Sequence, residues 1–340
     1  MKQKVLIGLS GGVDSSVSAY LLQEAGYEVE GVYMILHKKE GYHESNIEKV
    51  EKVGSFLGIK THILDLSQSF DKAVFQPFIA SYKAGLTPNP CALCNRNIKF
   101  GEMVAFADRI GADKIATGHY VKTDGQYIYE ASSAHKDQSY FLFNIEPHVL
   151  QRAIFPLGDW NKEDVKAFAA KFPQIAELAT QKESSEICFV EDTYIDILRQ
   201  YVDVDQPGDV LDTEGRVVGR HEGYMKYTIG KRRGFTVSGA QVPHYVQQII
   251  PQTNQIVVGV HDALATTRMN LAQLNMFTTE KALKCRVKIR YRATAVGCEL
   301  QIHDDGHAVV VFDEPVYGVA KGQAAVFYDE GRLLGGGWIV

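Results

Sequence analysis

The stretch Val5-Leu6-Ile7-Gly8-Leu9-Ser10-Gly11-Gly12-Val13-Asp14-Ser15-Ser16 decides the fold of this chain. Its first five residues predict a buried strand, and residues 17–25 predict a helix that ends at Gly26. Paired glycines let a backbone approach a phosphate closely, and a helix N-terminus adds unpaired N–H groups and partial positive charge. The stretch therefore predicts an anion-binding loop at the first strand-to-helix junction. The alternative is a tight turn capped by Asp14 or Ser15.

The rest of the first half alternates short apolar strands with amphipathic helices. This pattern is typical of a doubly wound α/β domain with a parallel sheet. Further strands are predicted at 29–35, 61–66 and 114–117, and helices near 45–57, 71–82, 98–110, 162–171 and 193–201. Short strands and turns dominate after Gln206-Pro207-Gly208, and strands at 285–291, 299–303, 308–312 and 324–328 have the spacing of a small barrel. We predict a catalytic domain at 1–203, a small β-rich domain at 204–268 and a C-terminal β-barrel at 269–340.

The composition limits the function further. The 340 residues are 45% hydrophobic and 23% charged, as in globular proteins, and the chain is long for a single core. No apolar run reaches about 18 residues, so we expect no membrane association and a cytoplasmic protein. A formal charge of -5 requires any nucleic-acid site to be local. Five cysteines, an odd number, argue against a disulfide framework and favour reactive or metal-binding thiols.

The anion-binding loop lacks the lysine of a Walker-type P-loop, so γ-phosphate transfer is not the obvious chemistry. Ser10-Gly11-Gly12-Val13-Asp14-Ser15 instead resembles the PP-loop of N-type ATP pyrophosphatases, which split ATP between its α and β phosphates. Amidation, ligation and thiolation enzymes all use this loop. By itself it indicates a superfamily.

Two cysteine segments are candidates for chemistry. The two-proline loop Thr87-Pro88-Asn89-Pro90-Cys91-Ala92-Leu93-Cys94-Asn95 leads into the helix that carries Lys99, and a thiolate near a helix N-terminus is stabilised by the dipole. Cys188 lies far downstream in Ile187-Cys188-Phe189. Three alternatives stay open: Cys188 as a core residue, the Cys91/Cys94 pair as half of a zinc site, or a redox pair.

Cations recur at every second position of one predicted strand: Lys284, Arg286, Lys288, Arg290 and Arg292. Period two places them on one face of the strand. The pattern predicts either a track for a phosphate backbone or a solvated outer face.

Several segments together resemble the bacterial tRNA-specific 2-thiouridylase family. They are the PP-loop, the loop ending in Cys94-Asn95, Thr117-Gly118-His119-Tyr120, Asp137-Gln138-Ser139-Tyr140-Phe141-Leu142, Phe155-Pro156-Leu157-Gly158, Ile187-Cys188-Phe189, Tyr227-Thr228-Ile229-Gly230 and Gly335-Gly336-Gly337. The resemblance covers nearly the whole chain, and the three-part layout of the family agrees with the divisions above.

The resemblance implies a set of site residues. Those for ATP are Gly8, Leu9, Ser10, Gly11, Gly12, Val13, Asp14, Ser15, Met34 and Gly118. Cys94 would be the nucleophile and Cys188 the carrier of a persulfide. Those for tRNA are Asn89, Pro90 and Cys91 at the target base, then His119, Lys136, Asp137, Gln138, Arg290, Tyr291 and Gln323. Some relatives have Asp in place of Cys91, and no residue is assigned to a metal ion.

The implied reaction replaces the C2 oxygen of the wobble uridine of a tRNA with sulfur. ATP and Mg²⁺ would activate the base by adenylation, and the persulfide sulfur would follow, leaving a Cys94–Cys188 disulfide. A sulfur-donor protein, either a cysteine desulfurase or a sulfur-relay carrier, and a reductant are implied partners. One alternative has Cys91, Cys94 and Cys188 bind a [4Fe–4S] cluster. Another is a non-catalytic nucleotide- and RNA-binding protein.

Overall fold

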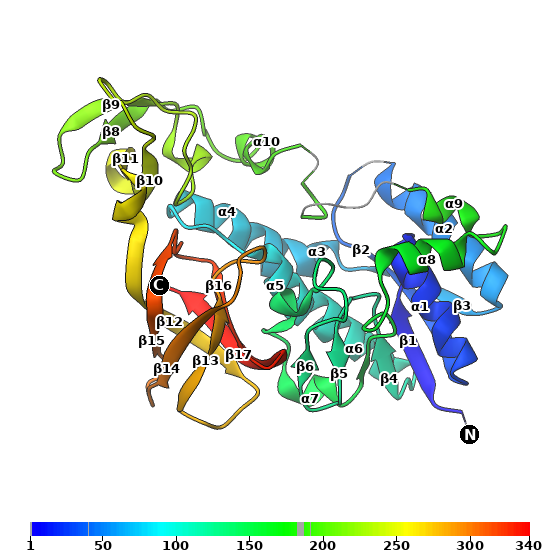
Figure 1. The fold of residues 1–340 in the computed structure, drawn as a ribbon. Coiled ribbons are helices and arrows are strands. Elements are labelled where there is room, and N and C mark those ends of the chain that lie inside the picture. The colour runs from blue at the N-terminus through cyan, green and yellow to red at the C-terminus, as the bar shows by residue number, and fades with distance from the viewer. Residues whose placement is uncertain (1, 40, 182–186, 191) are drawn as a thin grey trace.

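The computed structural model describes residues 2–39, 41–181, 187–190 and 192–340 (Figure 1). A five-stranded sheet forms the centre of the N-terminal part, and each of its strand pairs is parallel. The strand order is β3-β2-β1-β4-β7, with β1 Lys4–Gly8, β2 Glu28–Ile35, β3 Lys60–Asp65, β4 Lys114–Ala116 and β7 Ala153–Ile154. The prediction of a doubly wound parallel sheet is confirmed.

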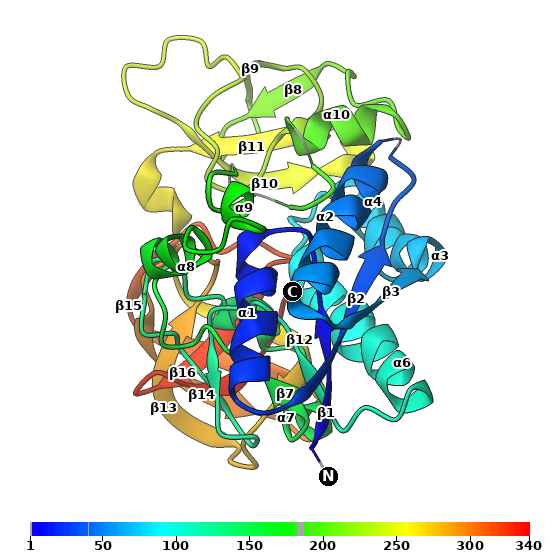
Figure 2. The same ribbon diagram turned by 90° about the vertical axis from the view of Figure 1, so that its right-hand side faces the viewer.

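Alternate residues of β1 are buried against opposite helical layers, as the period of a strand requires. Val5 and Ile7 pack in one cluster with residues of α1 Val13–Glu24 and α2 Tyr42–Leu57. Leu6 packs in another cluster with Met103 and Ala107 of α6 Met103–Arg109. Helix α8 Lys162–Ala169 packs beside α1, as Figure 2 shows.

Two helical runs on this domain contain π-helical segments. The first is α3 Ser67–Phe70, η1 Asp71–Phe75 and α4 Gln76–Lys83. The second is α5 Pro90–Cys94 and η2 Asn95–Glu102, continuing directly into α6. π-Helical segments are rare and occur frequently at functional sites.

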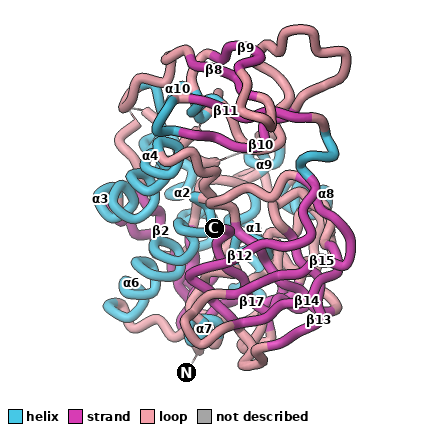
Figure 3. Tube along the Cα trace, turned by 90° about the vertical axis from the view of Figure 1, so that its left-hand side faces the viewer, coloured by secondary structure: helices cyan, strands magenta, loops and turns pink. Residues whose placement is uncertain are grey.

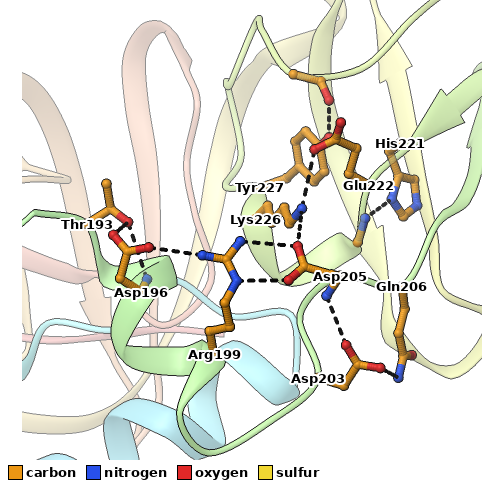
Figure 4. A network of polar contacts seen from close by, with 12 residues as sticks. Thr193, Asp196, Arg199, Asp203, Asp205, Gln206, His221, Glu222, Lys226 and Tyr227 are labelled. Atoms are coloured by element: carbon orange, nitrogen blue, oxygen red, sulfur yellow. Dashed lines mark hydrogen bonds and ion pairs between the residues drawn. The ribbon is translucent and has the colours of Figure 1, made fainter.

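The middle domain is a four-stranded sheet of order β10-β11-β8-β9, preceded by α10 Tyr194–Arg199. Its strands are β8 Gly208–Leu211, β9 Val217–His221, β10 Tyr245–Ile250 and β11 Gln255–Gly259. Figure 4 shows how α10 is tied to the segments that flank this sheet: the Asp205 carboxylate, before β8, lies between Arg199, at 2.8 Å, and Lys226, after β9, at 2.7 Å. Hydrogen bonds from Arg199 and Lys226 hold the pKa of Asp205 well below its ordinary value.

The C-terminal domain is a closed barrel of six strands, seen in Figure 3 below the middle domain. They are β12 Ala265–Met276, β13 Ala282–Lys288, β14 Val296–Ile302, β15 Ala308–Tyr317, β16 Ala324–Asp329 and β17 Arg332–Ile339, and pairing of β12 with β17 closes the barrel. The prediction of a barrel is confirmed. The hairpin of β5 Lys122–Thr123 and β6 Ile128–Tyr129, from the N-terminal part, adds to β17 and joins the two domains.

Short elements complete the structure: η3 Ser139–Leu142, α7 Pro147–Leu150, α9 Ala176–Ala179, η4 Tyr224–Lys226, η5 Pro251–Thr253 and η6 His261–Leu264. Among the described residues, no helix combines the length and the apolar character that crossing a bilayer requires. The predicted divisions after residues 203 and 268 remain predictions.

Candidate active site

The PP-loop turns tightly between β1 and α1. Gly11 has a φ of +79°, a left-handed conformation that favours glycine. The Ser15 hydroxyl donates to the Gly12 carbonyl at 3.1 Å and accepts from the Ser10 amide at the same distance. Hydrogen bonds of its own serine side chains thus fix the shape of the loop. The N-terminus of the twelve-residue α1 is directed toward it. A phosphate group fits this geometry.

Two other predicted ATP residues meet the PP-loop at the carboxyl end of the sheet. A β-carbon on Gly118 would lie 2.9 Å from the Ser15 nitrogen, so only glycine permits this approach of backbone to backbone. A β-carbon on Gly8 would lie 3.5 Å from the Met34 methyl group. Because ligands of doubly wound sheets bind at this edge, the fold brings the predicted nucleotide residues to the expected place.

The sequence patterns gave no sign of a lysine beside this loop. Lys162, the first residue of α8, is buried, and its Nζ lies 2.6 Å from Oδ2 of Asp14. The Tyr120 hydroxyl donates to Oδ1 of Asp14, also at 2.6 Å. The carboxylate is therefore fixed on both oxygens. Lys162 lies 148 residues from Asp14 in sequence, so no local pattern could have paired the two.

The cysteine loop becomes a short helix. The Asn89 side chain caps α5 by accepting from the Ala92 amide at 3.3 Å. Cys91 is half-buried in the first turn of α5, and Cys94, its last residue, is buried. The helix N-terminus expected for the cysteine loop lies at Cys91 rather than at Cys94, because α5 begins at Pro90 and the helical run continues through η2, which places Cys94 inside it.

The three candidate thiols act on one another. Burial raises the pKa of Cys91 to about 11 and the pKa of Cys94 to about 12. Cys188 is exposed, yet the protein around it removes enough water to raise the pKa of its thiol as well. Electrostatic repulsion from Cys188 adds to the rise at both other cysteines. The fold therefore brings Cys91, Cys94 and Cys188 within electrostatic range of one another, although up to 97 residues separate them in sequence.

One cation opposes this rise at all three thiols. The Lys99 ammonium lowers the pKa of Cys91, Cys94 and Cys188, although burial outweighs it. Lys99 Nζ lies 3.4 Å from His119 Nε2, and His119 Nδ1 lies 2.7 Å from the Thr117 hydroxyl. The pKa of His119 lies well below its ordinary value, mainly because the imidazole is buried and to a smaller extent because the Lys99 charge is close to it. His119 is therefore neutral.

Hydrogen bonds join the C-terminal barrel to the cysteine loop. Gln323 donates from Nε2 to the carbonyls of Thr87 at 3.3 Å and Pro88 at 3.0 Å. The Tyr140 hydroxyl donates to the Ala324 carbonyl at 2.9 Å. Asn89 Nδ2 is buried, and the Asn89 side chain lies beside the Tyr140 hydroxyl, where its hydrogen bond partly offsets the rise that burial causes in the pKa of Tyr140.

Other residues predicted to contact tRNA lie around the same junction. Asp137 is buried and accepts from the Ser139 hydroxyl at 2.8 Å, and Gln138 Oε1 accepts from the Tyr120 amide at 3.0 Å. The Tyr291 ring lies 4.4 Å from that of Phe141, between centroids. Lys136 is half-buried and Arg290 is exposed. Their contacts with tRNA remain predictions.

The five alternating cations are not equally available. Lys284 pairs with Glu299 at 3.1 Å, and Arg286 donates to the Ala295 carbonyl at 2.7 Å. Lys288 is largely buried and pairs with Glu130 at 2.7 Å. Arg290 and Arg292 follow β13 and are exposed, and within the described part of the chain neither forms an ion pair. Any phosphate track is therefore centred on the end of this strand.

Three protein-family models together match nearly the whole chain. Residues 3–192 match the family described as the tRNA methyl transferase HUP domain. Residues 195–260 match the tRNA methyl transferase PRC-barrel domain, and residues 262–339 match the aminomethyltransferase beta-barrel domain.

Full-length relatives are similar throughout. The tRNA-specific 2-thiouridylase MnmA of a Nitratiruptor species is 56% identical over 340 residues, covering 100% of both chains. The protein of the same name from Sulfurimonas denitrificans is 57% identical over 339 residues, covering 100% of this chain and 99% of its own. Among solved structures, a 4-thiouridine synthetase–RNA complex with bound ATP aligns with a TM-score of 0.37 at 19% identity, covering 55% of this chain and 45% of that one.

Proposed function

The chain belongs to the tRNA-specific 2-thiouridylase family and is an ATP-dependent enzyme of tRNA uridine thiolation, and we propose that it acts on the wobble uridine through an adenylated base and a persulfide on Cys188. One observation carries the assignment of the site. Gly118 touches the PP-loop, and the next residue, His119, touches Lys99 beside the cysteines. The nucleotide half and the sulfur half of the site are therefore adjacent.

Adenylation comes first in the proposed reaction. The wobble base must leave the anticodon stack to reach the PP-loop. Its O2 attacks the α-phosphorus of ATP, a new O–P bond forms, and the bond to the β-phosphate breaks to release pyrophosphate. Mg²⁺ bound with ATP would supply charge neutralisation for the departing pyrophosphate in this proposal. The carboxylate of the loop, Asp14, is engaged by Lys162 and Tyr120, so we assign no protein ligand to the ion.

Sulfur transfer follows. The Cys94 thiolate attacks Sγ of the Cys188 persulfide, which forms the Cys94–Cys188 disulfide and expels hydrosulfide with the bonding electron pair. Hydrosulfide adds to C2 of the activated uridine, and AMP leaves with the former O2. A thiol reductant then restores both cysteines with two electrons. We propose a cysteine desulfurase or a sulfur-relay carrier as the sulfur donor, and a cytoplasmic location.

tRNA would lie across the domain junction in this proposal. The predicted contacts at Asn89, Pro90, Cys91, His119, 136–138, 290–291 and 323 come from five separate segments of the chain. Aromatic contacts of Tyr140 and Tyr291 and the Gln323 hydrogen bonds join these parts. The domain division at 1–203, 204–268 and 269–340 is proposed with it.

The three-cysteine [4Fe–4S] cluster is a second candidate for the sulfur chemistry. The thiols of Cys91, Cys94 and Cys188 interact electrostatically, and thiolates are the usual ligands of such clusters, but among the described residues no group of three His, Cys, Asp or Glu side chains is placed to hold a metal ion, so the persulfide mechanism is preferred. The cluster would hold sulfide on an open iron. Absorption and iron content of anaerobically purified protein distinguish it from the persulfide mechanism.

The experiment that tests the proposal separates its two halves. Protein is mixed with ATP and unfractionated tRNA from a strain that lacks 2-thiouridine, with and without a persulfide donor. Pyrophosphate release in both mixtures, with 2-thiouridine only when the donor is present, is the expected result. Absence of pyrophosphate release would favour a non-catalytic nucleotide- and RNA-binding protein.

A further inference from the structure

The position of Lys99 depends on the unusual winding of η2. Lys99 follows Cys94 by five residues, which in an α-helix is about 500° of rotation, so the two side chains would point about 140° apart. η2, residues Asn95–Glu102, is a π-helix, whose hydrogen bonds run from residue i to i+5. A π-helix has about 4.4 residues per turn, so five residues rotate about 410° and the two side chains point only about 50° apart. Lys99 therefore returns to the face of the helix that carries Cys94.

A chain of polar contacts fixes the Lys99 ammonium in place. An ammonium has only donors, so the His119 Nε2 that lies 3.4 Å away must be the acceptor. The proton of the neutral imidazole is then on Nδ1 and is donated to the Thr117 hydroxyl at 2.7 Å. Thr117 and His119 directly follow β4, so the core sheet determines where the cation lies.

Among the described residues, the surroundings of the three thiols hold no cation that competes with Lys99. Within the described part of the chain, Lys99 is the only positive group that acts on Cys91, Cys94 and Cys188. Tyr33 and Tyr42 near Cys188 and Tyr291 near Cys91 are the other titratable groups, among the described residues, that interact with these sulfurs. Burial raises the pKa of each tyrosine, so they are neutral.

We propose that Lys99 is a positioning residue for sulfur transfer: its ammonium, oriented by neutral His119, stabilises the negative charge that passes among the cysteine sulfurs. The inference rests on the proposed function and adds a requirement to its second half. In the step Cys94–S⁻ + Cys188–S–SH → Cys94–S–S–Cys188 + HS⁻, a full negative charge is present before and after. A buried site without a cation would disfavour both the Cys94 thiolate before the step and the hydrosulfide after it. Adenylation has no such requirement.

The test is a single-turnover assay with the Cys188 persulfide loaded beforehand. ATP and unfractionated tRNA from a strain lacking 2-thiouridine are added, and 2-thiouridine and pyrophosphate are followed in the same samples. The variants are Lys99→Met and Lys99→Arg. Lys72→Met is the matched control, because Lys72 is an exposed lysine of the other π-helical segment, η1.

We expect Lys99→Met to slow 2-thiouridine formation at least about tenfold while pyrophosphate release stays within about twofold of wild type. Lys99→Arg should restore most of the rate, and Lys72→Met should behave as wild type. Wild-type thiolation by Lys99→Met, equal loss of pyrophosphate release, or no rescue by arginine would each overturn the inference. A wild-type protein that forms no 2-thiouridine would instead contradict the proposed function itself.

Discussion

The ammonium of Lys162 lies 2.6 Å from the carboxylate of Asp14, although 148 residues separate them. The PP-loop has no lysine of its own, and the docking of α8 on α1 brings one to it. Tyr120 donates to the other oxygen of the same carboxylate. The loop is thus held from outside, by α8 and by the segment that follows β4.

This contact predicts that the PP-loop depends on Lys162. Lys162→Met leaves Asp14 without its cation and should cost about 1–3 kcal/mol of stability while lowering the rate of adenylation. Asp14→Ala should lower that rate as well, and the double variant should lose less than the sum of the two. Pyrophosphate release and urea unfolding measure the two effects. Strictly additive losses would show that the residues act independently.

The close approach of Gly118 to Ser15 predicts a sharp steric effect. A β-carbon in Gly118→Ala would lie 2.9 Å from the Ser15 nitrogen and must displace the PP-loop backbone. We expect pyrophosphate release to fall at least about tenfold. Gly215→Ala is the control, because Gly215 has a φ of +81° but open space around it, so the substitution strains the backbone far from the site. Equal activity of the two variants would remove Gly118 from the nucleotide site.

The unequal pairing of the cations near β13 predicts which of them contact tRNA. Arg290→Ala should weaken tRNA binding and lower the slope of log K against log salt by about 0.7–0.9 for each phosphate that is no longer neutralised. Lys288→Ala should leave that slope unchanged and lower stability, because Lys288 is paired with Glu130 and lies over the Tyr328 ring. Binding measured at several salt concentrations decides between them. The reverse pattern would place the track on the strand itself.

The carboxylate of Glu30 predicts a pH dependence of stability. Burial favours its neutral form, but hydrogen bonds from His62 at 2.5 Å and from Lys4 outweigh burial and lower its pKa from 4.5. A lowered pKa gives stability that is present above about pH 4.5 and is lost as the pH falls through the folded-state pKa. Glu30→Gln should therefore be less stable than wild type by about 1–3 kcal/mol at pH 7.

The difference between wild type and Glu30→Gln should shrink in urea unfolding below about pH 4. Glu28→Gln, an exposed change two residues earlier on the same strand, should show little effect at any pH. A difference that stays constant from pH 7 to pH 3 would mean that Glu30 contributes through packing alone.

Much of the fold could be predicted because its patterns are local. The apolar strand before the PP-loop and the alternation after it were enough to predict the parallel sheet. Two barrel strands, β12 and β17, were missed. β17 contains Gly335, Gly336 and Gly337, which lower strand propensity, and the barrel needs them since a β-carbon on Gly336 would lie 2.6 Å from the Phe143 ring.

The site was harder to predict, because it depends on contacts between distant segments. The cysteines and the PP-loop were visible as motifs, but Lys162, Lys99 and the raised thiol pKa values follow from burial and docking. The alternation of cations gave no sign that Glu130, on the β5–β6 side of the barrel, would neutralise Lys288. A two-residue period in the sequence predicts the face of the strand on which the side chains lie. It does not predict which residues cover that face.

The three cysteines provide the most direct test of the central claim, namely that adenylation and sulfur transfer are separate steps with separate residues. Cys94→Ser and Cys188→Ser are assayed with ATP, a persulfide donor and unfractionated tRNA lacking 2-thiouridine, beside Cys91→Ser. Pyrophosphate and nucleosides are measured together, the latter by mass spectrometry. We predict pyrophosphate release by all three variants, no 2-thiouridine from Cys94→Ser or Cys188→Ser, and substantial 2-thiouridine from Cys91→Ser. Loss of thiolation in Cys91→Ser equal to that in Cys94→Ser, with iron in anaerobically purified wild type and none in the variant, would contradict it and establish the three-cysteine cluster.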